Sequence, residues 1–192
     1  MAKTINEKKD LIRAQISSDN SKMHDCAFRS NEICKNILNI IYSRLHFINH
    51  RSLSNVIGVY WPFKLEPDIL KLAISNNYYA ALPKIQDNQM SFVKYNIGDK
   101  LEKNTLGFKQ PSLDIFVQPK LVIIPGICFS LDGYRLGYGK GYYDKYLKEF
   151  SKDDNVISIG VCFHQFLRTT LPVSCNDYRC DYIVTEKNII QI

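Results

Sequence analysis

The chain has 192 residues and carries 25 Lys and Arg against 19 Asp and Glu, a formal net charge of +6. Its 45% hydrophobic and 23% charged residues exclude a disordered or fibrous protein, and its length suffices for one domain with a sizeable core. No apolar run reaches the ~18 residues of a membrane span, and the first residues lack the apolar stretch of a secretory signal, so we expect a cytoplasmic protein that does not enter a membrane.

The N-terminal third is predicted to be helical. Apolar residues recur at helical spacing in two segments, which contain Ile5, Ile12 and Ile16, then Ile33, Ile37, Ile40, Ile41 and Leu45. The pattern then changes to a β-branched run over residues 55–60, which predicts a strand ending before Pro62. Pro67 precedes a short apolar segment and predicts a helix start at residues 66–68.

The following residues predict short strands separated by loops. Residues 78–82 form a strand pattern that Pro83 is expected to close, and residues 91–95 alternate like an edge strand. Four glycines and prolines make residues 97–120 mostly loop. Residues 121–124 are a continuous apolar run, as in a strand buried on both faces, and residues 156–161 and 182–185 are similar.

Strands that alternate with helices predict an α/β fold. We expect a mainly parallel β-sheet flanked by helices in three layers, with N-terminal helices, in a single domain spanning residues 1–192. Ligands of such sheets bind beyond the carboxyl ends of the strands. The six cysteines form no CxxC pair and no zinc spacing with the four scattered histidines, so we expect mostly small buried thiols and no disulfide framework.

Glycine is scarce in the chain, yet five of the nine glycines lie between residues 126 and 141. This loop follows the most buried predicted strand and precedes a helix that runs to about Phe150. Alternating glycines expose backbone N–H groups to a ligand, the helix N-terminus favours phosphate, and Arg135 and Lys140 add positive charge. The spacing matches neither the dinucleotide-binding fingerprint nor the P-loop, so a tight structural turn stays open beside nucleotide binding.

At this point the sequence resembles a known family. The run Arg135-Leu-Gly-Tyr-Gly-Lys-Gly-Tyr-Tyr-Asp144, with Pro125, Gly126, Phe129 and Gly133 before it, closely resembles the signature of 5-formyltetrahydrofolate cyclo-ligase, also called methenyltetrahydrofolate synthetase. The resemblance extends to the other segments of the chain: Lys9-Asp-Leu-Ile-Arg13, Tyr60-Trp61-Pro62 with Glu66, Ile159-Gly-Val-Cys-Phe163 with Gln165, Leu171-Pro172, Asp177, Asp181 and Val184-Thr-Glu186. It therefore runs from the first helix to the last strands.

The resemblance implies an ATP- and magnesium-dependent cyclisation of 5-formyltetrahydrofolate to 5,10-methenyltetrahydrofolate, with release of ADP and phosphate. Phosphorylation of the formyl oxygen turns it into a good leaving group, so the protein mainly positions its substrates and neutralises phosphate charge. The implied partners are small molecules, with no nucleic acid and no membrane, and the chain is expected to be a monomer.

The resemblance also implies roles for individual residues. Arg135 and Lys140 would be catalytic, and Asp144 and Asp177 would hold Mg²⁺. ATP would contact Lys9, Arg13, Arg135, Gly137, Gly139, Lys140, Gly141 and Tyr142. The folate would contact Trp61, Glu66, Tyr138 and Tyr142. Taken without the family, each has a plain structural interpretation, such as a solvated helix face for Lys9 and Arg13 or a charge in the first helical turn for Asp144.

One departure from the family pattern is visible. Gln110 stands where the family usually carries a glutamate before a proline, here Pro111. This exchange favours one alternative, a diverged protein that binds folate or nucleotide without turnover. A second alternative is another α/β enzyme, such as a sugar-phosphate isomerase or a CoA transferase relative. A nucleic-acid-binding module would account for the charge but leaves the glycine-rich loop unexplained.

Overall fold

The computed structural model describes residues 3–18, 24–44, 56–74, 78–150 and 156–192. Its helices are α1 (Ile5–Ser18), α2 (Cys26–Arg44), α3 (Leu70–Ile74) and α4 (Tyr142–Phe150). The two predicted N-terminal helices are therefore present, and the predicted position Leu45 lies outside the described residues. Helix α3 begins at Leu70, two residues after the predicted start at residues 66–68, so Pro67 precedes the helix. Asp68 Oδ1 accepts a hydrogen bond from the first amide of α3, Leu70 N–H.

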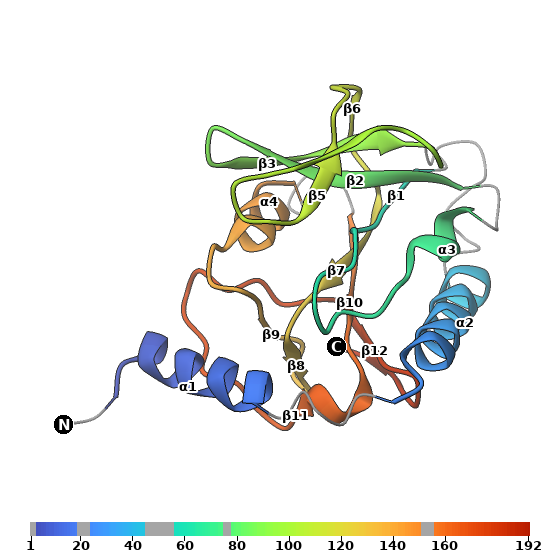
Figure 1. The fold of residues 1–192 in the computed structure, drawn as a ribbon. Helices are drawn as coiled ribbons and strands as arrows, with labels where there is room; N and C mark the ends of the chain where they lie inside the picture. Colours follow the sequence, from blue (N-terminus) through green and yellow to red (C-terminus); the bar gives the residue numbers. More distant parts are fainter. Residues whose placement is uncertain (1–2, 19–23, 45–55, 75–77, 151–155) are drawn as a thin grey trace.

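The centre of the fold is an eight-stranded mixed sheet with the order β13-β12-β10-β7-β1-β2-β3-β6 (Figure 1). The middle of the sheet is parallel, from β12 through β10, β7 and β1 to β2, and the outer strands pair antiparallel. Its strands are β1 (Val56–Gly58), β2 (Tyr79–Gln86), β3 (Gln89–Tyr95), β6 (Phe116–Val117), β7 (Leu121–Pro125), β10 (Ile157–Val161), β12 (Tyr182–Val184) and β13 (Ile189–Gln191).

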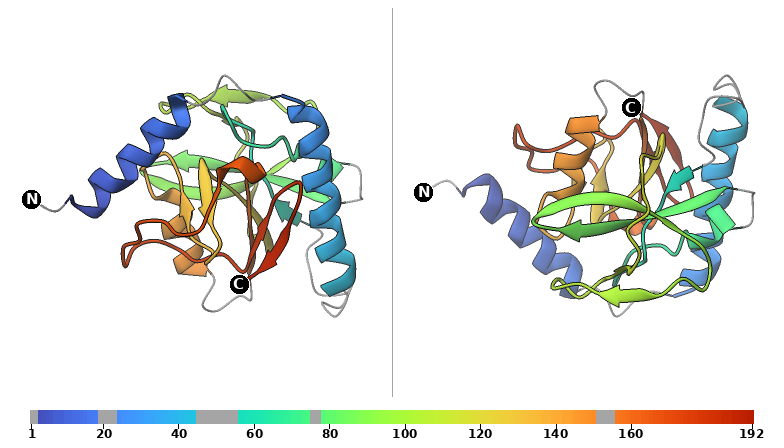
Figure 2. Two further views of the ribbon diagram at one scale, coloured as in Figure 1. Left: turned by 90° about the horizontal axis from the view of Figure 1, so that it is seen from below. Right: turned by 90° about the horizontal axis from the view of Figure 1, so that it is seen from above.

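Two smaller sheets stand beside the large one. They consist of β4 (Leu101–Lys103) with β5 (Lys109–Pro111), and of β8 (Cys128–Ser130) between β9 (Arg135–Leu136) and β11 (Leu167–Arg168). A 3₁₀ turn at His164–Phe166 precedes β11. Helices α2 and α3 lie on one side of the central sheet and α4 on the other (Figures 1 and 2). The predicted α/β class with a mainly parallel, helix-flanked sheet is thus confirmed.

The most buried strand is the one expected from the sequence. All five residues of β7 are buried, because β1 and β10 pair with its two edges and the flanking layers cover its faces. Directly after β7, the buried Phe129 of β8 packs where Gly160 of β10 has no side chain, since a Cβ there would lie 2.2 Å from the ring. This packing holds the start of the glycine-rich loop against the sheet.

Two strand expectations need correction. Strand β2 continues through Pro83 to Gln86. The carbonyl of Ala81 points toward β1, because it accepts the Val59 N–H. Pro83, two residues later, points toward the same edge, but β1 pairs with β2 only as far as Ala81, so the ladder needs no N–H there. Residues 91–95 do not form an edge, because β6 pairs outside β3.

The segment 97–120 is mostly loop, as predicted, and it also contains the short strands β4, β5 and β6.

The cysteines follow the sequence expectation in part. All six are free thiols: Cys128, Cys162 and Cys180 are buried, whereas Cys175 is exposed and the remaining two are partly buried. Burial raises the pKa of each of the three buried thiols, so they are poor nucleophiles near neutral pH. None of the described helices combines the length and the apolar composition needed to cross a bilayer.

Candidate functional site

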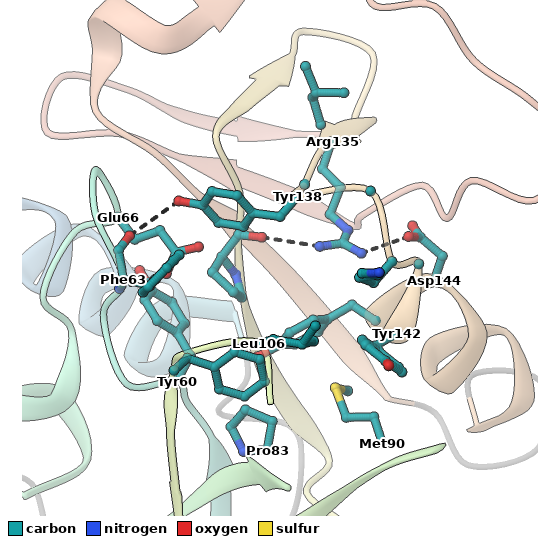
Figure 3. Close-up of a pocket in the computed structure, with 18 of the residues that line it drawn as sticks. Tyr60, Phe63, Glu66, Pro83, Met90, Leu106, Arg135, Tyr138, Tyr142 and Asp144 are labelled. Atoms are coloured by element: carbon teal, nitrogen blue, oxygen red, sulfur yellow. Dashed lines mark hydrogen bonds and ion pairs between the residues drawn. The ribbon is translucent and has the colours of Figure 1, made fainter. Parts of the chain in front are cut away.

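A cavity of about 510 Å³ opens where several parallel strands end. Its wall includes Pro125 at the end of β7, the segment from Tyr60 to Glu66 that follows β1, and Pro83 and Ile85 in the second half of β2. Helix α1, the glycine-rich loop and the start of α4 supply further lining residues. Figure 3 shows Tyr138 of the loop and Tyr142 and Asp144 of α4 around the cavity. The cavity therefore occupies the position expected for a ligand site of a parallel sheet.

The glycine-rich loop forms the wall next to α1. Gly139 and Gly141 adopt φ values of +97° and +69°, a conformation that side-chain-bearing residues rarely adopt. Arg13 Nε on α1 donates a hydrogen bond of 2.8 Å to the carbonyl of Gly137, and a Cβ on Gly139 would lie 3.5 Å from the Arg13 guanidinium. The Arg13 hydrogen bond thus attaches α1 to the loop, and an added Cβ on Gly139 would make ordinary van der Waals contact with Arg13.

Arg135 is the most firmly held cation of the cavity. Its side chain is 9% exposed, Nη2 lies 2.7 Å from Asp144 Oδ2, and Nη1 donates to the carbonyl of Pro125. Figure 3 shows the guanidinium held from two sides, with Asp144 on one of them. Lys140, in contrast, is an exposed member of the lining. One fixed and one exposed cation thus face the same space.

A second ion pair brings the N-terminal helix and the C-terminal segment together. Lys9 Nζ lies 2.7 and 2.6 Å from the two carboxylate oxygens of Asp177, and both side chains are largely buried. Asp177 also accepts hydrogen bonds from the backbone N–H and the hydroxyl of Ser174. Burial opposes the charged form, but the Lys9 and Ser174 donors outweigh it and lower the pKa of Asp177.

The two predicted metal ligands provide a chemically suitable but incomplete donor set for Mg²⁺. Asp144 and Asp177 both line the cavity, and Asp144 Oδ1 accepts the N–H of Tyr178, the neighbour of Asp177. In the structure Asp144 pairs with Arg135 and Asp177 pairs with Lys9. These side-chain cations supply the positive charge that a metal ion would supply when bound. Within the described ranges no group of three or more His, Cys, Asp and Glu could hold a metal ion. Mg²⁺ commonly binds one or two protein carboxylates and completes its shell with phosphate and water oxygens, and its binding here stays a prediction.

The opposite end of the cavity is aromatic and surrounds one carboxyl group. Glu66 Oε2 accepts the N–H of Phe63 at 3.0 Å. Burial raises the pKa of Glu66 to about 8, although that hydrogen bond and the charge of Arg135 act in the opposite direction. Burial and the Glu66 charge together raise the pKa values of Tyr60, Tyr138 and Tyr143. Glu66 therefore lies among three tyrosines and can switch between a neutral and an ionised form near physiological pH.

Two aromatic contacts define the sides of this end. The rings of Phe63 and Tyr138 meet edge to face at 5.3 Å, and the Tyr138 hydroxyl donates to the carbonyl of Phe63 (Figure 3). Lys64 Nζ lies over both rings, and Lys109 Nζ lies 4.6 Å from the centre of the Trp61 ring. The glycine-rich loop is thereby connected to the segment that follows β1.

All the residues singled out from the sequence line this one cavity. They are Lys9, Arg13, Trp61, Glu66, Arg135, Gly137, Tyr138, Gly139, Lys140, Gly141, Tyr142, Asp144 and Asp177. The structure brings them together without assigning their roles. Sequence reasoning missed Tyr60, Tyr143 and the wall that the β4–β5 hairpin adds through Leu106, Phe108 and Lys109. Tyr143 lay within the recognised motif, whereas nothing in the loop-like composition of residues 97–120 indicated a cavity wall.

Gln110, the departure from the family pattern, is buried and hydrogen-bonded. It is 4% exposed, lies outside the cavity lining, and its Oε1 accepts the backbone N–H of Ile85 and the side-chain N–H of Asn104. Its Nε2 donates to Glu102. Gln110 thus satisfies a β2 amide beyond the end of β1 and fixes the β4–β5 hairpin. The exchange removes no charge from the cavity.

Comparison with known proteins agrees with this geometry. A model of the 5-formyltetrahydrofolate cyclo-ligase family matches residues 5–186. A probable 5-formyltetrahydrofolate cyclo-ligase of Schizosaccharomyces pombe is 28% identical over 50% of this chain, and the match spans 56% of that relative's length. The 5-formyltetrahydrofolate cyclo-ligase of Mycoplasma genitalium is 30% identical over 72% of this chain and 76% of its own.

A solved structure extends the likeness to the fold. The NMR structure of the Aquifex aeolicus 5,10-methenyltetrahydrofolate synthetase superposes with a TM-score of 0.73 at 27% sequence identity. The superposition covers 95% of this chain and 92% of that one. The similarity therefore includes the helices and strands that surround the cavity.

Proposed function

Because the chain belongs to the 5-formyltetrahydrofolate cyclo-ligase family, we propose that it converts 5-formyltetrahydrofolate and ATP to 5,10-methenyltetrahydrofolate, ADP and phosphate. The observation that supports this most strongly is the single cavity with a cationic end at Arg13, Arg135 and Lys140 and an aromatic, carboxyl-bearing end at Glu66. A triphosphate suits the first end and a folate ring the second.

The reaction needs two bond exchanges at the formyl group. The formyl oxygen attacks the terminal phosphorus of ATP, and the bond to the leaving ADP breaks. The neighbouring folate nitrogen then attacks the formyl carbon, loses its proton and closes the ring, while the carbon–oxygen bond breaks and its electron pair leaves with phosphate. Both steps require alignment and stabilised negative charge more than a protein nucleophile.

At the nucleotide end, Lys9, Arg13, Arg135 and Lys140 would neutralise phosphate charge. Gly137, Gly139 and Gly141 would let the backbone approach the phosphates, and Tyr142 would contact them at the start of α4. Of these, Arg135 and Lys140 would act on the transferred phosphoryl group. Asp144 and Asp177 would hold Mg²⁺, which supplies charge neutralisation on the nucleotide. The Lys9–Asp177 pair keeps both side chains at the cavity wall.

At the folate end, Trp61, Tyr138 and Tyr142 would provide flat apolar contact with the ring system. Glu66 in its ionised form would accept hydrogen bonds from ring N–H donors. The Phe63 N–H bond already orients the Glu66 carboxyl group, so little ordering is needed when the ring arrives.

The test is the appearance of the methenyl product by its near-ultraviolet absorbance. Purified protein is mixed with 5-formyltetrahydrofolate and Mg²⁺, with and without ATP. An ATP-dependent rise supports the proposal, and an ATP-independent or absent rise contradicts it. Folate binding without turnover would identify a diverged binder instead. The monomeric state, the single domain and the cytoplasmic location stay predictions, to be tested by size-exclusion chromatography, limited proteolysis and cell fractionation.

A further inference from the structure

Two buried hydrogen-bond donors at the cavity wall have no acceptor among the residues that the structure describes. They are the hydroxyl of Tyr143 and the Nε of Arg135. Buried polar groups in folded proteins nearly always have a partner, so a lone donor at a ligand cavity calls for an explanation. The Arg135 Nε–H can only donate and the Tyr143 hydroxyl has a proton to donate, so an acceptor such as an oxygen atom would satisfy both groups.

The Tyr143 ring is held firmly in place. Tyr143 lies in the first turn of α4, directly before Asp144, and its ring contacts Phe92 edge to face at 6.4 Å. The guanidinium of Arg135 lies 5.1 Å above the ring centre. The ring therefore cannot turn its hydroxyl toward another partner without losing both contacts.

Tyr143 also neighbours both proposed ends of the cavity. The guanidinium of Arg135, at the proposed phosphate end, lies over its ring, and the charge of Glu66, at the proposed folate end, acts on the same side chain. The reacting group of a substrate that joins both ends would therefore come near this hydroxyl.

We infer that the Tyr143 hydroxyl contacts the substrate, donating a hydrogen bond to the formyl oxygen of 5-formyltetrahydrofolate, with the Arg135 Nε as a second donor beside it. This inference rests on the proposed function. The formyl oxygen becomes the bridging oxygen to phosphorus and later takes the electron pair of the breaking carbon–oxygen bond. A donor at this atom stabilises the charge that develops there. The contact requires a small adjustment of the cavity wall as substrate enters, as is common for catalytic hydrogen bonds.

A purely structural role makes the opposite prediction for stability. If the hydroxyl supports the fold, its removal lowers the melting temperature and leaves kinetics unchanged. If the hydroxyl is instead an unpartnered donor that serves the substrate, its burial without a partner destabilises the protein. Tyr143→Phe then removes this destabilising group. The variant then melts at the same temperature as the unaltered protein or higher, while the reaction suffers.

The experiment compares Tyr143→Phe with Tyr146→Phe. Tyr146 is also buried on α4 and contacts Phe92, with ring centres 5.2 Å apart, but it does not line the cavity. Thermal melting, kcat/KM from the methenyl absorbance, and calorimetric affinities for 5-formyltetrahydrofolate and for a non-hydrolysable ATP analogue are measured for both. We expect Tyr143→Phe to lose about 10- to 100-fold in kcat/KM, the range for a hydrogen bond to a charged group. Tyr146→Phe is expected to keep its kinetics.

Each outcome has one meaning. A loss in kcat/KM or in formylfolate affinity at an undiminished melting temperature supports the inference, and unchanged affinity for the ATP analogue places the acceptor on the folate. A lower melting temperature with unchanged kinetics overturns it, and so does a variant that matches the unaltered protein throughout. If the unaltered protein forms no product with ATP, the proposed function fails instead. The formylfolate affinity of Tyr143→Phe then still tests the contact.

Discussion

Lys9 and Asp177 lie 168 positions apart in the sequence, and the structure joins them through an ion pair with 2.6 Å between Nζ and Oδ2. This contact and the bond from Arg13 to Gly137 attach α1 to the cavity wall. The helix is thereby part of the site rather than an appendage. An intact Lys9–Asp177 pair is consequently expected to matter for stability as well as for nucleotide binding.

Lys9→Met is expected to lower the free energy of unfolding by about 3 kcal/mol, because it leaves a largely buried carboxylate without its cation. The KM for ATP should rise at the same time. Chemical denaturation and steady-state kinetics measure the two effects. Lys35→Met is the control, since its pair with Glu32 is exposed and within one helix, and its effect should stay within about 0.5 kcal/mol. Equal effects of the two variants would contradict the structural role of Lys9.

Lys140→Ala should leave the fold almost unchanged and impair catalysis, because its side chain is exposed and lies at the proposed phosphate end. We expect an unfolding free energy within about 0.5 kcal/mol of the unaltered protein and a fall in kcat/KM for ATP of at least about tenfold. Arg135→Ala should lose both activity and stability, since it breaks a largely buried pair with Asp144. Unimpaired turnover by Lys140→Ala would remove that residue from the catalytic proposal.

Glu66 predicts a pH dependence with a definite sign. Its pKa in the folded chain is about 8, above the ordinary value of 4.5, so the folded state holds a proton that the unfolded state releases between these values. The contribution of this group makes stability fall as pH rises from about 4.5 to 8. The KM for formylfolate should fall over the upper part of the same interval, as the accepting carboxylate forms.

Glu66→Gln should abolish both trends and weaken formylfolate binding more than ATP binding. Urea denaturation at several pH values and calorimetry with each ligand provide the measurements. A variant that retains the pH dependence of KM would assign that dependence to another group. A larger loss of ATP affinity than of folate affinity would mean that the two ends of the cavity are interchanged.

Asp144→Asn should reduce the response of the reaction to Mg²⁺, because an amide is a weaker ligand than a carboxylate. The activity of the variant is titrated with MgCl₂ at fixed ATP, beside Asp114→Asn as control, whose carboxylate pairs with Lys84 outside the cavity lining. A titration curve for Asp144→Asn that superposes on that of the unaltered protein would exclude Asp144 as a metal ligand.

Gly139→Ala tests the proposed contact between the glycine-rich loop and ATP, because Gly139 lines the cavity and Gly98 does not. Gly139 and Gly98 have φ values of +97° and +93°, so alanine is strained at both, by about 1 kcal/mol. At Gly98 nothing lies within 4 Å of an added Cβ, whereas at Gly139 the Arg13 guanidinium is 3.5 Å away. Both variants should lose similar stability, and only Gly139→Ala should show a raised KM for ATP. The same KM in both would show that the loop tolerates a side chain there.

The sequence by itself determined the class of fold and part of the cavity lining. Amphipathic spacing in the N-terminal third and the uninterrupted apolar run of β7 depend on local burial, so their pattern is visible along the chain. The motif from Arg135 to Asp144 is local as well, because a tight loop needs its glycines at fixed spacing. The remaining site residues came from the family resemblance, and they also line the cavity.

Only the tertiary structure decided which groups meet. Contacts between distant segments pair Lys9 with Asp177 and bury Glu66, which raises its pKa. The pairing of Arg135 with Asp144 lies within the motif, but it forms only when the loop folds back against the start of α4. The same holds for Pro83, which is tolerated inside β2 because the pairing with β1 ends before it. It also holds for Gln110, whose buried side-chain amide forms hydrogen bonds at a position where the family usually carries a charged glutamate. Spacing along a chain records the period of a helix or strand, but not which side chain from elsewhere completes a hydrogen bond or leaves Tyr143 without one.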